Sequence, residues 1–329
     1  MKIYLVKRSF FTFREKESYE TDLCGKTVLS LMAENLGAEV CGEDALPAGE
    51  KVVLYPCYPF LSLRRLNGLL RSREGSFSFR GGYVDRGGEG KKTGARFPFP
   101  LFTLADLPAV LAQAGRAVAA YHAKRGALVE EGAETDYASE LKKGCIVRKG
   151  ARVIASVIGE NTEICGDSVI ENSVIGAETV IKSSRVLHSV VKKGCTLGPF
   201  SMLRAGSSVG DGCRIGDFVE IKNSSLGEGC KAAHLAYIGD ATLGKKVNVG
   251  CGVVFANYNG KIKQRSSVGD GCFLGSNCNL IAPVTLGDGV FLAAGTTLTR
   301  DLSSSDFCIG RCRERVKEGG AEKYLGKRE

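Results

Sequence analysis

The sequence predicts an α/β domain followed by a parallel β-helix of hexapeptide repeats. Apolar residues recur at every sixth position through most of residues 191–311, and glycine often follows them, as in Leu197-Gly198 and Val209-Gly210. A period of six fits neither an α-helix nor a single alternating strand, whereas three hexapeptides make one triangular coil. The repeat positions are Val191, Leu197, Leu203, Val209, Ile215 and Ile221, then Val268, Leu274, Leu280, Leu286, Leu292 and Leu298.

Residues 1–125 are expected to form a small sheet covered by helices, because strand-like and helical stretches alternate there. The expected strands are Lys2–Val6 and Lys51–Tyr55, with a hairpin at Phe77–Val84. The expected helices are Lys26–Leu36, Leu61–Leu70 and Ala105–Lys124, and Arg86–Arg96 is expected as a loop. A linker at 126–142, the β-helix at 143–311 and a basic tail at 312–329 are expected to follow. At three hexapeptides per coil, residues 158–300 are expected to form about eight coils.

Composition narrows the class of protein. The net charge of +9 is modest and spread along the chain, so we expect small anionic substrates and no nucleic acid as partners. No apolar run reaches the ~20 residues that a membrane helix needs, and the N-terminal apolar stretch is too short for a signal peptide. We therefore expect no membrane insertion and a cytoplasmic location.

The thirteen cysteines contain no C-x-x-C pair and their number is odd, which argues against disulfides or a cysteine metal site. Five of them lie two residues before a repeat position, so their side chains are expected to fill the coil interior as reduced thiols. These are Cys195, Cys213, Cys230, Cys272 and Cys278. The chain has three histidines, which argues against a three-histidine zinc site, and no metal is expected.

Two cations are expected to stack on one face of the coils. Arg204 and Lys222 each follow a repeat position, and three hexapeptides, which make one full coil, separate them. Adjacent strands lie ~4.8 Å apart, so the two charges repel unless an anion or a carboxylate lies near both. Two interpretations stay open: a solvated ladder partly paired with Glu220, or a clamp for a phosphate group.

A lone histidine follows two hexapeptides after Lys222. His234 follows the small residues Ala232 and Ala233, which leave space beside it. A lone histidine is more often structural, but this surrounding space favours a general base. Beyond it the repeat breaks, since the step from Phe255 to Val268 is longer by one position than two hexapeptides. Residues 256–263 are expected to form a loop that brings Lys263 to the stacked pair.

At these residues the sequence resembles a known family. The motifs are Leu203-Arg204-Ala205-Gly206, Gly216-Asp217-Phe218-Val219-Glu220-Ile221-Lys222-Asn223, His234-Leu235-Ala236-Tyr237-Ile238-Gly239-Asp240, Val247-Asn248-Val249-Gly250 and Ala256-Asn257-Tyr258-Asn259-Gly260. They resemble the C-terminal domain of the bifunctional bacterial UDP-N-acetylglucosamine pyrophosphorylase/glucosamine-1-phosphate N-acetyltransferase over about residues 145–311. The resemblance implies left-handed coils and a homotrimer with sites between neighbouring columns.

The resemblance also implies roles for individual residues. His234 is expected to take a proton from the 2-amino group of glucosamine-1-phosphate. The sugar phosphate is expected to be bound by Arg204, Lys222 and Lys263, and the sugar to be positioned by Tyr237 and Asn248. The acetyl-CoA groove is expected to be lined by Cys251, Asn257, Tyr258, Ser276, Ala294 and Arg311. Cys251 departs from the alanine usual in the family, and its bulk is expected to crowd the acetyl group.

The N-terminal domain resembles the sugar-nucleotide pyrophosphorylases less closely. Residues 53–62 are similar to the segment in which a strand ends in Gly-Asp-x-Pro-Leu, but Pro56 and Cys57 replace the glycine and the metal-binding aspartate. The run Arg8–Phe13 contains no glycine where the family has a glycine-rich phosphate loop. Without that loop and carboxylate, nucleotidyl transfer lacks its electrophilic parts. We expect a shortened, degenerate nucleotidyltransferase-like domain.

Two other functions stay open at this point. The same site is compatible with acetylation of a different amino sugar. The column is also compatible with a non-catalytic trimeric scaffold, in which residues 1–125 form an interaction module.

Overall fold

The computed structural model describes residues 2–7, 12–13, 16–17, 26–47, 51–54, 66, 77–79, 82–85, 93–94, 107–318 and 320–321. The chain forms two compact units. One contains residues 1–125 and 134–140, and the other contains residues 126–133 and 141–329.

The first unit contains a six-stranded mixed sheet in the order β4-β1-β5-β7-β6-β8. The strands are β1 (Lys2–Val6), β4 (Glu39–Cys41), β5 (Lys51–Leu54), β6 (Phe77–Phe79), β7 (Gly82–Asp85) and β8 (Thr93–Gly94), and β2 (Thr12–Phe13) pairs with β3 (Lys16–Glu17) in a separate ribbon. The other elements are α1 (Val28–Leu36), the 3-10 turn η2 (Glu43–Ala45) and α3 (Leu107–Ala123).

Local chemistry explains the boundaries of α1. The Thr27 side chain accepts a hydrogen bond from the Ser30 N–H at the N-terminus, and Gly37 ends the helix in the left-handed region. The expected strands at 2–6 and 51–55, the hairpin at 77–84 and two of the helices are confirmed within the described residues. Thr93–Gly94, expected within a loop, pairs instead with the open edge of β6. Apart from Leu66, the expected helix at 61–70 lies outside the described residues, as do segments 8–11 and 55–62.

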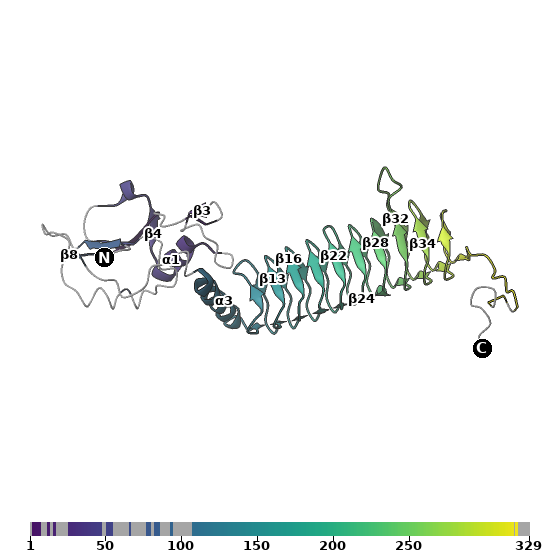
Figure 1. The fold of residues 1–329 in the computed structure, drawn as a ribbon, viewed down its shortest axis with the longest axis horizontal. Coiled ribbons are helices and arrows are strands. Elements are labelled where there is room, and N and C mark those ends of the chain that lie inside the picture. The colour runs from purple at the N-terminus through teal and green to yellow at the C-terminus, as the bar shows by residue number, and fades with distance from the viewer. Residues whose placement is uncertain are drawn as a thin grey trace. The chain divides into compact units, whose positions relative to one another are not determined.

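The predicted parallel β-helix belongs to the second unit apart from residues 134–140, and its coils form a column with three faces (Figure 1). Face 1 contains β9 (Leu128–Val129), β12 (Ile146–Val147), β15 (Glu163–Cys165), β18 (Val180–Lys182), β21 (Thr196–Leu197), β24 (Arg214–Asp217), β27 (Lys231–His234), β30 (Asn248–Val249), β33 (Phe273–Leu274), β36 (Phe291–Leu292) and β38 (Phe307–Cys308). Face 2 contains β10 (Glu134–Thr135), β13 (Arg152–Ile154), β16 (Val169–Glu171), β19 (Arg185–Leu187), β22 (Met202–Arg204), β25 (Glu220–Lys222), β28 (Tyr237–Gly239), β31 (Val254–Ala256), β34 (Asn279–Ile281) and β37 (Thr297–Leu298). Face 3 contains β11 (Glu140–Leu141), β14 (Val157–Ile158), β17 (Val174–Ile175), β20 (Val190–Val191), β23 (Ser208–Val209), β26 (Ser225–Leu226), β29 (Ala241–Leu243), β32 (Ser266–Val268) and β35 (Thr285–Leu286).

The coils begin earlier and are less uniform than the six-residue step predicts. Residues 126–142, expected as a linker, contain β9, β10 and β11, which are the first strands of the three faces. Leu141 is buried with the rest of the apolar core, and this burial favours an additional coil. Val180 pairs with Thr196 and Thr196 with Arg214, so two successive coils differ in length.

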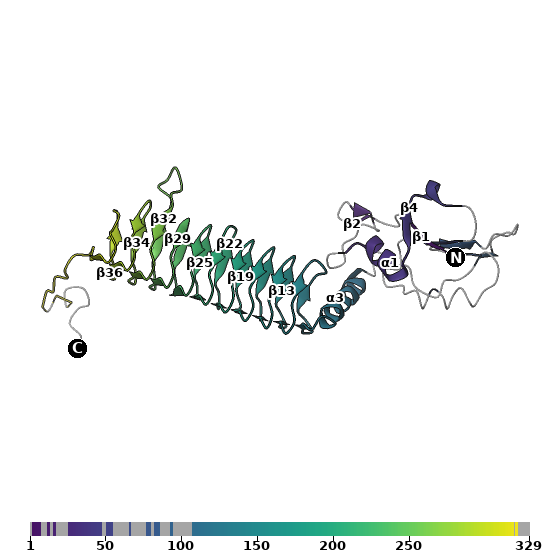
Figure 2. The ribbon, with the colours of Figure 1, turned by 180° about the vertical axis from the view of Figure 1, so that it is seen from behind.

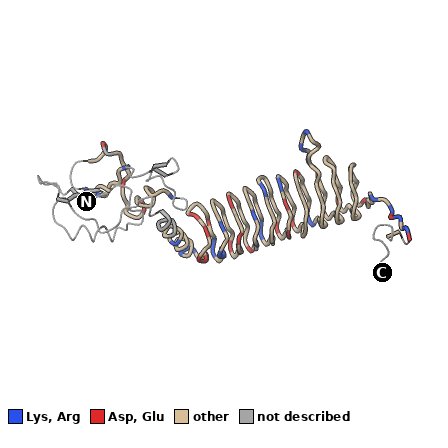
Figure 3. The backbone as a smooth tube through the Cα atoms, viewed as in Figure 1, with Lys and Arg blue, Asp and Glu red and all other residues tan. Residues whose placement is uncertain are grey.

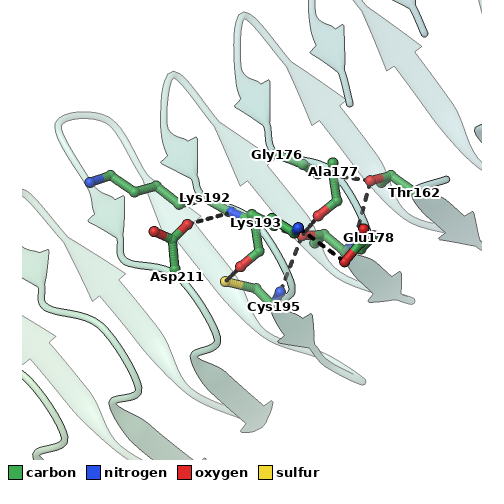
Figure 4. A network of polar contacts seen from close by, with 9 residues as sticks. Thr162, Gly176, Ala177, Glu178, Lys192, Lys193, Cys195 and Asp211 are labelled. Atoms are coloured by element: carbon green, nitrogen blue, oxygen red, sulfur yellow. Dashed lines mark hydrogen bonds and ion pairs between the residues drawn. The ribbon is translucent and has the colours of Figure 1, made fainter. Parts of the chain in front are cut away.

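Small polar side chains inside the column link each coil to the next. The Cys213 thiol donates a hydrogen bond to the Gly227 carbonyl at 3.1 Å, and the Cys230 thiol donates to the Gly244 carbonyl at 3.0 Å. The Thr162 hydroxyl likewise donates a hydrogen bond to the Gly176 carbonyl at 2.7 Å (Figure 4). The five cysteines expected in the interior are buried and free, which confirms that prediction. These hydrogen bonds satisfy buried carbonyl groups that would otherwise be costly to desolvate.

One loop interrupts the column. Residues 257–265 connect β31 to β32 and project beside β32 in both views (Figures 1 and 2). Phe255 and Val268 therefore lie on neighbouring faces of one coil, and the expectation that two slightly lengthened hexapeptides join them is wrong. A single corner carries the whole insertion. An antiparallel bridge between Tyr258 and Lys263 closes the loop.

Positive and negative residues are interspersed along the column, and the projecting loop carries basic residues (Figure 3). Within the part of the chain that the structure describes, no helix is long and apolar enough to cross a membrane.

Candidate functional site

The expected cations lie together at the corner between faces 2 and 3, here called the second corner. Arg204 and Lys222 are direct partners in the pairing of β22 with β25. Lys263 comes from the projecting loop, and its contact with the Lys222 ammonium lowers the pKa of Lys263. An ammonium group loses its proton more easily beside another cation. The lowered pKa of Lys263 therefore indicates an excess of positive charge at this corner.

Glu220 neutralises part of this charge. Its Oε1 accepts a hydrogen bond from Arg204 Nη1 at 2.8 Å, and this contact raises the pKa of Arg204. The ladder is thus partly paired at Arg204. The two lysines have a different neighbour.

The carboxyl group near Lys222 and Lys263 is that of Asp240, which is 7% exposed. Burial opposes ionisation of its carboxyl group, but hydrogen bonds from Asn223 and Asn257 and the charges of Lys222 and Lys263 outweigh burial and lower the pKa of Asp240. The Asn223 amide nitrogen is 2.6 Å from Asp240 Oδ1, and the Asn257 amide donates to Oδ2. The carboxylate therefore fastens the first residue of the projecting loop to the column. Arg265 fastens the other end through the Asn223 carbonyl at 3.1 Å.

Tyr237 lies over face 2 beside the cations. Gly239 takes the position after Lys222 in the ladder, and a Cβ added there would lie 2.5 Å from the Tyr237 hydroxyl oxygen. Glycine at 239 therefore leaves room for the tyrosine ring. Tyr237 lies near both Arg204 and Lys263.

His234 lies at the other edge of face 2, at the corner between faces 1 and 2, here called the first corner. It ends β27 and pairs in register with Asp217 at the end of β24. His234 Nδ1 is 2.6 Å from Asp217 Oδ1, and the imidazole side chain is 57% exposed. The hydrogen bond from His234 lowers the pKa of Asp217. Only Leu235 and Ala236 separate His234 from Tyr237.

Four of the six expected acetyl-CoA residues line the same corner. The pairings Ala232–Val249, Val249–Leu274 and Leu274–Leu292 place the residues two positions later in one row along the first corner. This corner row consists of His234, Cys251, Ser276 and Ala294, and all four are exposed. Arg311 Nη1 donates a hydrogen bond to the Ala294 carbonyl at 2.6 Å and so lies beside the corner row.

The other expected residues lie elsewhere on the chain. Asn257 is buried against Asp240 at the second corner, and the exposed Tyr258 follows it in the loop. Asn248 lies on face 1 in β30, whereas the cations and Tyr237 belong to face 2. A single column thus does not bring Asn248 to the cations.

Sequence reasoning missed the roles of two carboxylates in this geometry. Asp217 precedes His234, and Asn223 precedes Asp240, by slightly less than three full hexapeptides. A search for partners at a uniform step of three hexapeptides passes over both. Allowing the shorter coil, as between Arg214 and Lys231, would have found them. Among the described residues, no group of three or more His, Cys, Asp or Glu side chains is arranged to hold a metal ion.

Two repeat models match parts of the column. The bacterial transferase hexapeptide model, of six repeats, matches residues 188–223, and the hexapeptide repeat of succinyl-transferase matches residues 266–300.

Curated relatives match a longer stretch. The chain is 49% identical over 164 residues to the bifunctional protein GlmU of Alkaliphilus oremlandii, a match that covers 50% of this chain and 36% of the relative. It is 40% identical over 205 residues to the bifunctional protein GlmU of Staphylococcus haemolyticus, covering 61% of this chain and 46% of the relative. The match thus spans less than half the length of these relatives. The resemblance to the bifunctional family is confirmed for the C-terminal half of the chain.

Among solved structures, the UDP-N-acetylglucosamine acyltransferase of Francisella novicida is 19% identical, with a TM-score of 0.38 over 56% of this chain and 67% of that chain.

Proposed function

We propose that the chain is an N-acetyltransferase that transfers the acetyl group of acetyl-CoA to the amino group of glucosamine-1-phosphate. The observation that carries the proposal is the gathering of three cations at the second corner: Arg204 pairs directly with Lys222, and Lys263 lies near enough to Lys222 that its pKa is lowered. Cations held this close favour a bound dianion, and a sugar phosphate supplies one. The identity of 49% to a bifunctional protein GlmU supports the same substrate class.

In the proposed reaction, the phosphate held at the second corner orients the sugar across face 2. His234 Nε2 takes a proton from the amino group as its nitrogen attacks the thioester carbonyl, because an ammonium group is not a nucleophile. The new C–N bond forms, the C–S bond breaks, and the CoA thiolate leaves and is protonated. The backbone N–H of Cys251 would stabilise the oxyanion of the tetrahedral intermediate.

We also propose that the pantetheine arm of acetyl-CoA follows the first corner past Cys251, Ser276 and Ala294 towards Arg311. The exposure of this row of residues supports the proposal, since small side chains leave the backbone open to a ligand. Arg311 would bind a phosphate group of CoA. The proposed setting is the cytoplasm, where free thiols persist.

The proposed assembly is a homotrimer with sites between neighbouring columns. Asn248 would then reach the sugar from face 1 of an adjacent copy, which resolves its separation from face 2 of its own chain. Phe273, Phe291 and Phe307 support face 1 as the contact surface, because they stack with ring centroids 4.6 and 5.5 Å apart and remain 40–64% exposed. Light scattering should give three times the 35.0 kDa chain mass, and a monomer would refute this assembly.

Residues 1–125 are proposed to lack uridylyltransferase activity, because Pro56 and Cys57 occupy the positions of the family's glycine and aspartate. UTP-dependent pyrophosphate exchange tests this directly. Measurable exchange by the purified chain would refute it.

A substrate panel tests the transferase proposal. Thiol release from acetyl-CoA is measured with glucosamine-1-phosphate, unphosphorylated glucosamine and other amino sugars, with and without UTP. Rapid release is expected with glucosamine-1-phosphate, independent of UTP. Lys263→Ala should raise the KM for the sugar phosphate, while the control Lys261→Ala in the same loop should not. Equal use of unphosphorylated glucosamine would refute the proposed role of the cations.

A further inference from the structure

The imidazole of His234 is held by a carboxylate from the preceding coil. Asp217 and His234 are partners in the register of β24 with β27, and their side chains meet at 2.6 Å between Oδ1 and Nδ1. The contact joins two adjacent parallel strands, so the column itself sets the separation of the two backbones. Side chains as long as those of aspartate and histidine can therefore meet across the two strands.

The chemistry of the pair determines which nitrogen carries the proton. Hydrogen bonding to His234 lowers the pKa of Asp217, so the carboxyl group is ionised at neutral pH and can only accept hydrogen bonds. His234 Nδ1 must therefore donate, and in the neutral ring the lone pair then resides on Nε2. Among the described residues, His234 is the one side chain that hydrogen-bonds to the Asp217 carboxylate. The imidazole is 57% exposed, which leaves Nε2 open to a substrate.

We infer that Asp217 is a positioning residue for acetyl transfer: it keeps His234 in the tautomer whose Nε2 accepts the proton of the attacking amine. This inference rests on the proposed function. When Nε2 takes that proton, both ring nitrogens carry hydrogen and the ring becomes positive. The adjacent carboxylate stabilises that positive ring, and Asp217 itself stays ionised. The proton later leaves Nε2 for the CoA thiolate.

The exposed location of the pair distinguishes this role from a structural one. The Asp217 side chain is 35% exposed and the pair lies outside the apolar core, so the coils do not depend on it for packing. Other corner aspartates have a different partner. Asp211, in the same coil, accepts a hydrogen bond from the Lys193 backbone N–H at 2.9 Å (Figure 4). Asp211 thus provides a matched control at a corner of the same column.

The test compares the full-length wild type, Asp217→Asn and Asp211→Asn by two independent readouts. The first is nitrogen NMR of protein labelled at histidine, which needs no substrate. The chain has only three histidines, and His234→Gln assigns the relevant signals. The wild type should show the proton on Nδ1. The amide of Asp217→Asn can also donate, so the Nε2–H tautomer should increase in that variant and stay unchanged in Asp211→Asn.

The second readout is steady-state acetyl transfer. In Asp217→Asn, kcat should fall by about 10²- to 10⁴-fold, the range that a general base contributes, while the KM for the sugar phosphate stays unchanged. The acid limb of the pH–rate profile should also move in this variant. Asp211→Asn should retain wild-type rates.

The outcomes separate this inference from the proposed function. An unchanged tautomer or an unchanged kcat in Asp217→Asn overturns the role of Asp217 while acetyl transfer stands. A wild-type chain that acetylates no amino sugar refutes the proposed function and the catalytic role together, and the NMR spectra then still decide whether Asp217 holds the ring.

Discussion

Asp240→Asn should detach the projecting loop from the column. Asp240 is 7% exposed and accepts hydrogen bonds from two amide groups, those of Asn223 and Asn257. An asparagine at 240 keeps one oxygen but directs its NH₂ group at one of these donors. One hydrogen bond is lost and two donors face each other in a buried place, which costs about 1–3 kcal/mol.

The pH dependence of this effect follows from the lowered pKa of Asp240. A carboxyl group whose pKa is lower in the folded state stabilises the fold above its unfolded pKa, and loses that contribution as the pH falls through the folded value. The difference between wild type and Asp240→Asn should therefore be largest at neutral pH and shrink in acid, where protonated Asp240 resembles the amide.

The assay is chemical denaturation followed by circular dichroism, together with hydrogen exchange of the amides in residues 257–265. Asp270→Asn is the matched control, because Asp270 Oδ1 accepts a hydrogen bond from the Lys245 backbone N–H at 2.7 Å and an amide oxygen can replace it. The control should stay within about 0.5 kcal/mol of the wild type. Equal stability of Asp240→Asn and Asp270→Asn, with equal exchange in the loop, would show that Asp240 does not hold the loop to the column.

Four further predictions follow from the same geometry. Arg204→Ala should raise the KM for glucosamine-1-phosphate by about 10- to 100-fold with little change in kcat, since a charge-assisted hydrogen bond contributes ~1.5–3 kcal/mol; steady-state kinetics decide, and a change confined to kcat would contradict it. Gly239→Ala should displace Tyr237 and weaken sugar binding while circular dichroism stays unchanged, because the new Cβ would lie 2.5 Å from the phenol oxygen; unaltered binding would contradict the tyrosine's place. Phe255→Ala should cost about 3–5 kcal/mol in denaturation, because the side chain is 1% exposed, and a loss below ~1 kcal/mol would contradict its core position. Burial raises the pKa of Cys145 to about 11, so iodoacetamide at mildly alkaline pH should modify the exposed Cys251 before Cys145, as mass spectrometry can show, and the reverse order would contradict the burial.

The column could be predicted from sequence because its physical signal is local and repeated. Each hexapeptide places one apolar residue inward, so the step of six residues reports the coil directly, and the cysteines two positions earlier point the same way. The stacking of Arg204 on Lys222 followed from the same count. The six-residue step does not predict the first coil at 126–142, where charged residues mask the pattern. It also does not predict the path of the chain at 257–265, where an insertion replaces one corner.

The contacts between coils could not be read from the step alone. Asp217 meets His234, and Asp240 meets Asn223, across coils that are shorter than three full hexapeptides, and a coil shortens when a corner tightens. Such shortening depends on backbone geometry at each corner, including residues in the left-handed region such as Leu235 and Asp240. The separation of Asn248 from the cations likewise depends on which face a strand joins.

The most direct test of the proposed acetyltransferase activity is acetyl transfer to glucosamine-1-phosphate by the wild type and His234→Ala under identical conditions. We expect turnover by the wild type and a fall in kcat of about 10²- to 10⁴-fold in the variant, with the fold intact by circular dichroism. A variant that turns over as fast as the wild type would contradict it.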